Sequence, residues 1–257
     1  MPDLVTLSER GLRVARYLAE RMAGCTVYVH RSVEDHEAAV RFSRTADLLA
    51  ERFDRTDGIV FIGPCGVAVR TLAPLVQSKL RDPPVVVVDV GGRYVISLLG
   101  GHEAGANRLT ILVADILGAE PVITTTTEAS KTLIVGIGCR RGVAAETILE
   151  ILDDGLTQAG RRREEIRFLA TADIKADEPG IRIVAERIGT PLRIISSNAI
   201  RECRRAVSVS KTAVEKVGLP AVAEPTALLA GRRTKLLIPV IKKQGVALAI
   251  AEESCSW

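Results

Sequence analysis

Short runs of valine, isoleucine and leucine alternate along the chain with longer segments in which apolar residues recur every three or four positions. The first such unit is an apolar run at residues 4–7, an amphipathic segment at residues 9–22 and a second run at residues 26–29. In the amphipathic segment the apolar side chains fall on one face of a helix. Buried strands that alternate with helices are typical of an α/β fold and argue against an all-β sandwich.

The rest of the first half continues this alternation. Strands are predicted at residues 58–62, 85–89, 94–99 and 121–124, and helices at residues 44–53, 67–76 and 105–117. We expect Ser43 to cap the helix at residues 44–53. Gly91 and Gly92 form a turn that should join residues 85–89 and 94–99 as a hairpin.

After a run of four threonines at residues 124–127, the second half restarts the alternation. Strands are predicted at residues 132–137, 166–171 and 192–195, with a terminal hairpin of residues 235–241 and 246–251; helices are predicted at residues 143–158 and after residues 173–179. The sequence therefore predicts two α/β domains, residues 1–128 and 131–257, each with a mostly parallel sheet flanked by helices.

Charge is distributed unevenly between the two halves. Residues 1–130 hold 14 Lys and Arg against 16 Asp and Glu, whereas the remainder holds 21 against 15, which gives the net charge of +4. The basic second half suggests an anionic partner, either nucleic acid or an acidic small molecule. Because only 3% of the residues are aromatic, few side chains are available to stack on bases, and we favour the acidic small molecule over nucleic acid.

The sequence gives little support for a metal site, a disulfide framework or a membrane span. The five cysteines are odd in number and form no Cys-x-x-Cys pair, and there are three histidines: Cys25, Cys65, Cys139, Cys203 and Cys255; His30, His36 and His102. We expect no zinc site and no disulfide framework. No apolar run reaches the roughly 18 to 20 residues of a membrane span, and the start lacks a signal-peptide core, so we expect a cytoplasmic protein.

Two glycine-bearing loops in the first half are candidates for function. Gly63 and Gly66 follow a buried strand and precede a helix, where backbone N–H groups favour an anion; an ordinary tight turn explains them equally well. Gly100 and Gly101 precede His102 in a second strand-to-helix turn. A histidine with an ordinary pKa of about 6.5 can act there as a general base toward water.

Neighbours of this histidine, Glu103 and Asn107, could orient it or bind substrate. In the second half we expect a helix to open with Gly138, Cys139, Arg140, Arg141 and Gly142. The two guanidiniums of this segment can hold carboxylates, and a solvated basic turn is the alternative interpretation. Polar residues at further strand ends complete the predicted binding set: Thr171, Asp173, Lys175, Glu178 and Glu224.

At these motifs the chain resembles the cobalamin biosynthesis protein G (CbiG) family. The resemblance rests on DGIVFIGPCGVAVRTLAPLVQSKLRDPPVVVVDVGGRYVISLLGGHEAGANRLT and the residues that follow it, and on VGIGCRRG, LATADIKADEPGI and VGLPAVAEPTALLA. The second half is also similar to CobE. The resemblance covers most of residues 45–251 and implies a Rossmann-like first domain and a CobE-like second domain.

The resemblance implies a hydrolase that opens the ring-A δ-lactone of cobalt-precorrin-5A with water and releases acetaldehyde. In that case His102 acts on the water or on the proton transfer, N–H groups near Gly101 or Gly66 stabilise the oxyanion, and Arg140 and Arg141 hold carboxylates of the corrinoid. Cobalt belongs to the substrate, so no resident cofactor is expected, and a homodimer is left open.

The sequence departs from the family pattern in two respects. Gly100 stands where the family usually has serine, and Ala104, beside Glu103, replaces the first of two adjacent glycines. The chain is also a short form without the middle segment of full-length members. A corrinoid-binding or carrier protein without catalysis is therefore the second interpretation, and a basic nucleic-acid-binding protein is a weaker third.

Overall fold

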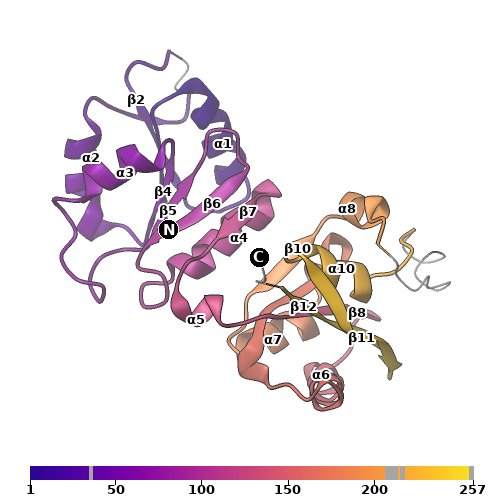
Figure 1. Ribbon diagram of the computed structural model, residues 1–257. Coiled ribbons are helices and arrows are strands. Elements are labelled where there is room, and N and C mark those ends of the chain that lie inside the picture. The colour runs from indigo at the N-terminus through magenta and orange to yellow at the C-terminus, as the bar shows by residue number, and fades with distance from the viewer. Residues whose placement is uncertain (35–36, 206–213, 215–217, 255–257) are drawn as a thin grey trace. The chain divides into compact units, whose positions relative to one another are not determined.

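The computed structural model describes residues 1–34, 37–205, 214 and 218–254 (Figure 1). His36 and Cys255 lie outside the described residues. The chain forms two compact units, Met1–Thr125 and Thr126–Trp257. Each unit is built around its own sheet, and both belong to the α/β class that the sequence predicts. None of the described helices has the length and hydrophobicity of a membrane span.

The first unit contains a seven-stranded sheet in the order β3-β2-β1-β4-β5-β6-β7. Its strands are β1 Asp3–Thr6, β2 Thr26–His30, β3 Val40–Phe42, β4 Ile59–Ile62, β5 Val85–Val88, β6 Tyr94–Leu99 and β7 Glu120–Val122. Five of the six pairings are parallel, and only β5 and β6 pair in antiparallel fashion. This hairpin confirms the prediction made from Gly91 and Gly92.

Helices cover both faces of this sheet, which explains why its strands are apolar at successive positions. α1 (Glu9–Ala19) and α4 (Ala106–Leu117) pack on the face that carries Val60 and Ile62. α2 (Thr45–Arg52) and α3 (Cys65–Leu72) pack on the face that carries Phe61. Since alternate residues of β4 serve the two cores, every position of this strand is buried.

The reversal at β6 changes which loops share an edge of the sheet. Val85 pairs with Leu99 and Val88 with Val95, so the carboxyl end of β6 lies where β5 begins. β6, α4 and β7 then form a parallel unit of their own. The loop after β6 therefore lies at the edge opposite to the loops that follow β1, β4 and β5.

The second unit contains a five-stranded sheet in the order β10-β9-β8-β12-β11. Its strands are β8 Leu133–Cys139, β9 Ile166–Ala172, β10 Leu192–Ile195, β11 Thr234–Lys243 and β12 Val246–Glu253. The helices among its described residues are α5 Thr126–Ala129, α6 Ala145–Ala159, α7 Pro179–Arg187, α8 Ser197–Glu202 and α10 Ala223–Leu229. The sheet is mixed, with two parallel and two antiparallel pairings.

One face of this second sheet packs against α6 and α7, and the other receives α10. The approach of α10 is close, because a Cβ at Gly136 would lie 1.9 Å from the carbonyl oxygen of Ala223. A glycine is therefore required at this point of β8, where the helix backbone rests on the strand backbone.

Two local predictions are wrong. The helix predicted to be capped by Ser43 begins at Thr45, and its N-cap is Arg44. The carbonyl of Ser43 accepts a hydrogen bond from His30 Nε2 at 2.9 Å. Gly138 and Cys139, predicted as loop, belong to β8, since both pair with β12. β3, α5, α8 and α10 are present in the structure without having been predicted.

Candidate functional site

The loop between β6 and α4, residues 100–105 and called the His102 loop below, is closed by its own backbone. Gly100 has φ +72° and Gly105, the N-cap of α4, has φ +87°, conformations that favour glycine. The carbonyl of Gly100 accepts the N–H of Ala106 at 3.0 Å, and that of Gly101 accepts the N–H of Asn107 at 2.9 Å. The loop thus satisfies donors in the first turn of α4 itself.

Asn107 fixes the loop against two other segments. Its Oδ1 accepts a hydrogen bond from the Ser97 hydroxyl at 2.8 Å, and its Nδ2 donates to the Thr125 hydroxyl at 3.2 Å. A Cβ at Gly101 would lie 2.8 Å from Cγ2 of Thr125 and 3.2 Å from Asn107 Oδ1. Asn107 is only 8% exposed, so it holds the loop from beneath; Ser97 and Thr125, its partners, had not been predicted.

His102 and Glu103 are exposed at the tip of the loop. Within the described residues, the His102 ring makes no hydrogen bond, and the N–H groups of Gly101 and His102 have no acceptor. Glu103 Oε1 pairs with Lys79 Nζ at 3.2 Å. Its own backbone N–H and Lys79 lower the pKa of Glu103, so that this side chain is a carboxylate rather than a proton donor near neutral pH.

The Gly63–Gly66 segment lies at the opposite edge of the sheet. The N–H of Gly63 is used by the carbonyl of Val88 at 2.9 Å, and Gly66 lies in the first turn of α3. Gly100 by contrast packs against Pro84. Gly63 lies level with the end of β5 and Gly100 with the residue before its start, so about five residues of extended strand, or roughly 16 Å, separate them. The expectation that Gly66 could serve the same oxyanion as His102 is therefore wrong.

In the second unit, Arg140 and Arg141 are exposed at the carboxyl end of β8. Neither guanidinium forms an ion pair with a carboxylate of the described residues. The N–H of Arg140 donates to the carbonyl of Gly245 at 2.8 Å, which ties this strand end to the turn between β11 and β12. The helix that follows, α6, begins only at Ala145, so the two arginines extend from a strand end and not from a helix N-terminus.

A buried carboxylate, that of Glu178, holds the segment after β8 that carries Arg140 and Arg141. Glu178, 5% exposed, accepts the N–H of Gly142 at 2.6 Å and pairs with Lys175 Nζ at 3.1 Å. Burial by itself would raise the pKa of Glu178, but the Gly142 N–H, Lys175 and Arg141 lower it on balance. Burial, with Glu178 nearby, raises the pKa of the Cys139 thiol to about 11, so this thiol is protonated at neutral pH.

The remaining predicted residues of the second unit have partners inside it. Thr171 is fully buried and donates to the carbonyl of Ile137 at 2.7 Å. Asp173 accepts the N–H of Ser197 at 2.8 Å and its hydroxyl, at the start of α8. Glu224, 2% exposed, accepts the N–H of Val240 at 3.0 Å. Gly138 packs beneath Val222, where a Cβ would lie 3.0 Å from that side chain's Cβ.

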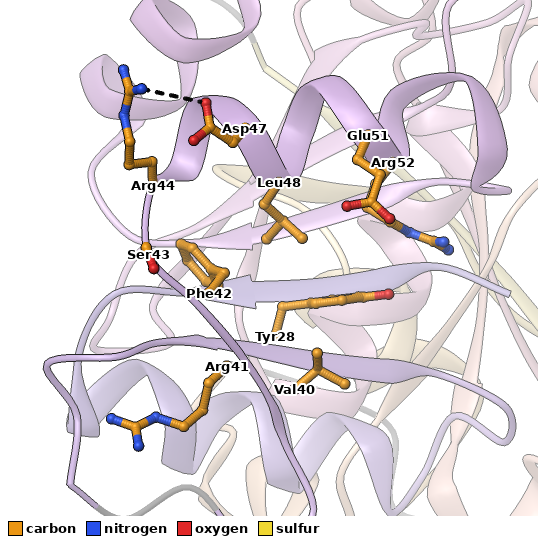
Figure 2. A pocket seen from close by; sticks show the side chains of 10 residues that line it. All are labelled: Tyr28, Val40, Arg41, Phe42, Ser43, Arg44, Asp47, Leu48, Glu51 and Arg52. Atoms are coloured by element: carbon orange, nitrogen blue, oxygen red, sulfur yellow. Dashed lines mark ion pairs between the residues drawn. The ribbon is translucent and has the colours of Figure 1, made fainter.

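A cavity of about 400 Å³ lies elsewhere in the first unit, between β3 and α2. Figure 2 shows the Tyr28 ring between Leu48 of the α2 helix, above it, and Val40, below it. Four strands separate β3 from β6, roughly 24 Å at the spacing of a sheet, so the cavity is not part of the His102 loop. No group of His, Cys, Asp and Glu side chains able to hold a metal ion occurs among the described residues.

Fold and loops together define a protein of two α/β units with glycine-bearing loops at strand ends. The family model for the Cobalamin synthesis G N-terminal domain matches residues 47–128, and that for the Cobalamin synthesis G C-terminus matches residues 133–251. The chain belongs to the cobalamin synthesis G family, which confirms the resemblance found in the sequence. Only residues 129–132 lie between the two matched segments.

Relatives of known name match parts of the chain. A cobalt-precorrin-5A hydrolase of Salmonella typhimurium is 41% identical over 128 residues, or 50% of this chain and 36% of the relative. A cobalt-precorrin-5A hydrolase of Priestia megaterium is 36% identical over 143 residues, or 54% and 38%. Protein CobE of a Sinorhizobium species is 30% identical over 128 residues, or 49% and 83%. The chain thus spans little more than a third of either hydrolase but most of CobE.

Proposed function

We propose that this chain acts in cobalamin biosynthesis as a cobalt-precorrin-5A hydrolase, opening the ring-A δ-lactone with water and releasing acetaldehyde. The observation that carries the proposal is the match of both family domains in order, combined with an exposed histidine whose ring makes no hydrogen bond to the described residues, on a loop that Asn107 anchors. The names of two relatives supply the reaction.

The geometry of the His102 loop suits lactone hydrolysis. His102 takes a proton from water as the water oxygen bonds to the lactone carbonyl carbon, and the ester C–O bond then breaks. The N–H groups of Gly101 and His102 can donate to the developing oxyanion, since the described residues leave both without an acceptor. Glu103, paired with Lys79, remains a carboxylate next to His102 in the loop.

Acetaldehyde release follows from the opened ester. The oxygen that leaves the carbonyl carbon becomes the aldehyde oxygen when the C–C bond to the macrocycle breaks, and the bonding electron pair passes into the conjugated ring. The imidazolium of His102 can then donate its proton to the macrocycle carbon from which the fragment has left. The macrocycle brings its own cobalt, and the proposal requires no resident cofactor.

The second unit supplies charge for recognition. Corrinoid intermediates carry acetate and propionate carboxylates at their rim, and a guanidinium can bind a carboxylate through two parallel hydrogen bonds. Arg140 and Arg141 are exposed, and neither forms an ion pair with a described carboxylate. We therefore assign them to the rim carboxylates, with Glu178 holding their turn in place.

The test is incubation of the purified chain with cobalt-precorrin-5A, with acetaldehyde followed by a coupled dehydrogenase and the corrinoid by mass. Loss of a general base lowers a rate by about 10²- to 10⁴-fold, so His102→Ala should release acetaldehyde that much more slowly. His30→Asn, which alters a histidine outside the loop, should leave the rate unchanged. Equal rates for His102→Ala and wild type would remove the role of His102. A corrinoid that binds but stays intact would contradict hydrolysis and leave a corrinoid-binding protein.

A further inference from the structure

The connection between α3 and β5 presents a leucine to solvent beside the His102 loop. Leu80 is 77% exposed, the largest exposed fraction among the large apolar side chains of the described residues. It lies at the tip of residues 77–82, called the 77–82 loop below. Single exposed apolar residues are common at protein surfaces, so exposure alone assigns no role.

The 77–82 loop is fixed by hydrogen bonds. The carboxylate of Asp82, only 5% exposed, accepts the N–H groups of Gln77 and Ser78 at 3.1 to 3.2 Å. The carbonyl of Ser78 accepts the N–H of Arg81 at 3.0 Å and that of Asp82 at 2.8 Å. The N–H of Leu80 donates to the Ser78 hydroxyl at 3.3 Å. The backbone that carries Leu80 is therefore held in one conformation, and ordering it costs a ligand little entropy.

Two contacts place this loop against the candidate site. Lys79 Nζ lies 3.2 Å from Glu103 Oε1. The residues that follow the loop pack on the start of the His102 loop, since a Cβ at Gly100 would lie 3.3 Å from Cα of Pro84 and 3.4 Å from the carbonyl oxygen of Pro83. Leu80 follows Lys79 directly, so the backbone that carries it runs next to the His102 loop.

We propose that Leu80 packs against the apolar face of the macrocycle when its lactone is held at His102. This inference rests on the proposed function. A corrinoid has charged groups at its rim and a broad hydrocarbon face, and the described residues of the His102 loop offer polar and backbone groups but no large apolar side chain. Leu80 supplies that apolar surface, and the rigid backbone beneath it sets how closely the ring approaches His102.

The experiment compares two exposed leucines of the first unit. Leu80→Ser removes the apolar contact, whereas Leu112→Ser changes a leucine on α4 that is 49% exposed and lies outside the loops. Each full-length variant is titrated with cobalt-precorrin-5A, and the bound corrinoid is measured by its visible absorbance after rapid ultrafiltration. We expect Leu80→Ser to raise the Kd about tenfold, which corresponds to about 1.4 kcal/mol, with Leu112→Ser and the Tm of both variants unchanged.

The outcomes separate this inference from the proposed function. Wild-type affinity in Leu80→Ser, or an equal loss in Leu112→Ser, overturns the role of Leu80 while leaving hydrolysis standing. Absence of corrinoid binding by the wild type overturns both. A change in sedimentation of Leu80→Ser without ligand would show that a second copy of the chain covers Leu80, which also overturns the inference. A raised KM with unchanged kcat in Leu80→Ser would support it, as expected when a contact serves ground state and transition state alike.

Discussion

Placing a serine at position 100 should destabilise the first unit. Gly100 has φ +72°, where a residue with a side chain costs about 1–2 kcal/mol. A Cβ there would also lie 2.7 Å from the Cβ of Ala104, and overpacking of this kind costs about 1–3 kcal/mol. We expect Gly100→Ser to lose about 3 kcal/mol, which for a unit of this size lowers Tm by roughly 10 °C.

The structure links positions 100 and 104 by their close approach. A side chain at position 100 and one at position 104 compete for the same space, so the chain can carry a Cβ at either position but not comfortably at both. Adding Ala104→Gly to Gly100→Ser should therefore recover about 1–2 kcal/mol, even though Ala104→Gly alone should be near neutral or slightly destabilising.

The double-mutant cycle is measured by urea unfolding followed through hydrogen exchange of peptides from β6 and α4, which report the first unit alone. Equal stability of Gly100→Ser and the double variant would refute the claim that side chains at positions 100 and 104 compete for the same space. Such a result would mean that the backbone conformation at Gly100, and not its distance to Ala104, carries the whole cost.

Two further predictions concern the second unit. The pKa of Glu178 is lowered in the fold, so its carboxylate stabilises the protein above the free value of 4.5 and this stabilisation is lost as pH falls through the lower folded pKa. Glu178→Gln should thus lose less stability than wild type between about pH 6 and pH 3 in chemical unfolding, and parallel curves would contradict the assignment. With a pKa of about 11, only about one Cys139 in a thousand is a thiolate at about pH 8, so iodoacetamide should label Cys139 far more slowly in the folded protein than in urea, as peptide mass mapping would show. Equal labelling rates would refute the burial of this thiol.

Local patterns in the sequence were sufficient to predict most of the strands. The four consecutive valines of β5 and the glycine turn before β6 predicted a hairpin that the structure confirms. β3 escaped prediction because it is an edge strand in which only Phe42 is buried, so no apolar run marks it. α10 escaped because alanine and Pro225 dominate its buried face, and neither produces the periodic pattern of large apolar residues.

Only those parts of the candidate site that lie close together in the sequence could be predicted. His102 and Asn107 lie within six residues, and the glycines around them mark the turn. Ser97 and Thr125 reach Asn107 across 10 and 18 residues, through the pairing of β6 and β7 and the segment that follows β7. The same limit explains the error at Gly66, since the direction of β6 decides which loops share an edge and no single segment reveals it.

The position of β12 has a consequence for synthesis of the protein. This strand comes last in the second sheet's sequence order yet lies between β8 and β11, so the sheet cannot close until the ribosome has made residues up to Glu253. The first unit's strands are complete by Val122, and that unit can fold while the second is still being made. A transcript cut short before residue 246 would leave β8, buried along most of its length in the finished fold, as an open apolar edge that invites aggregation.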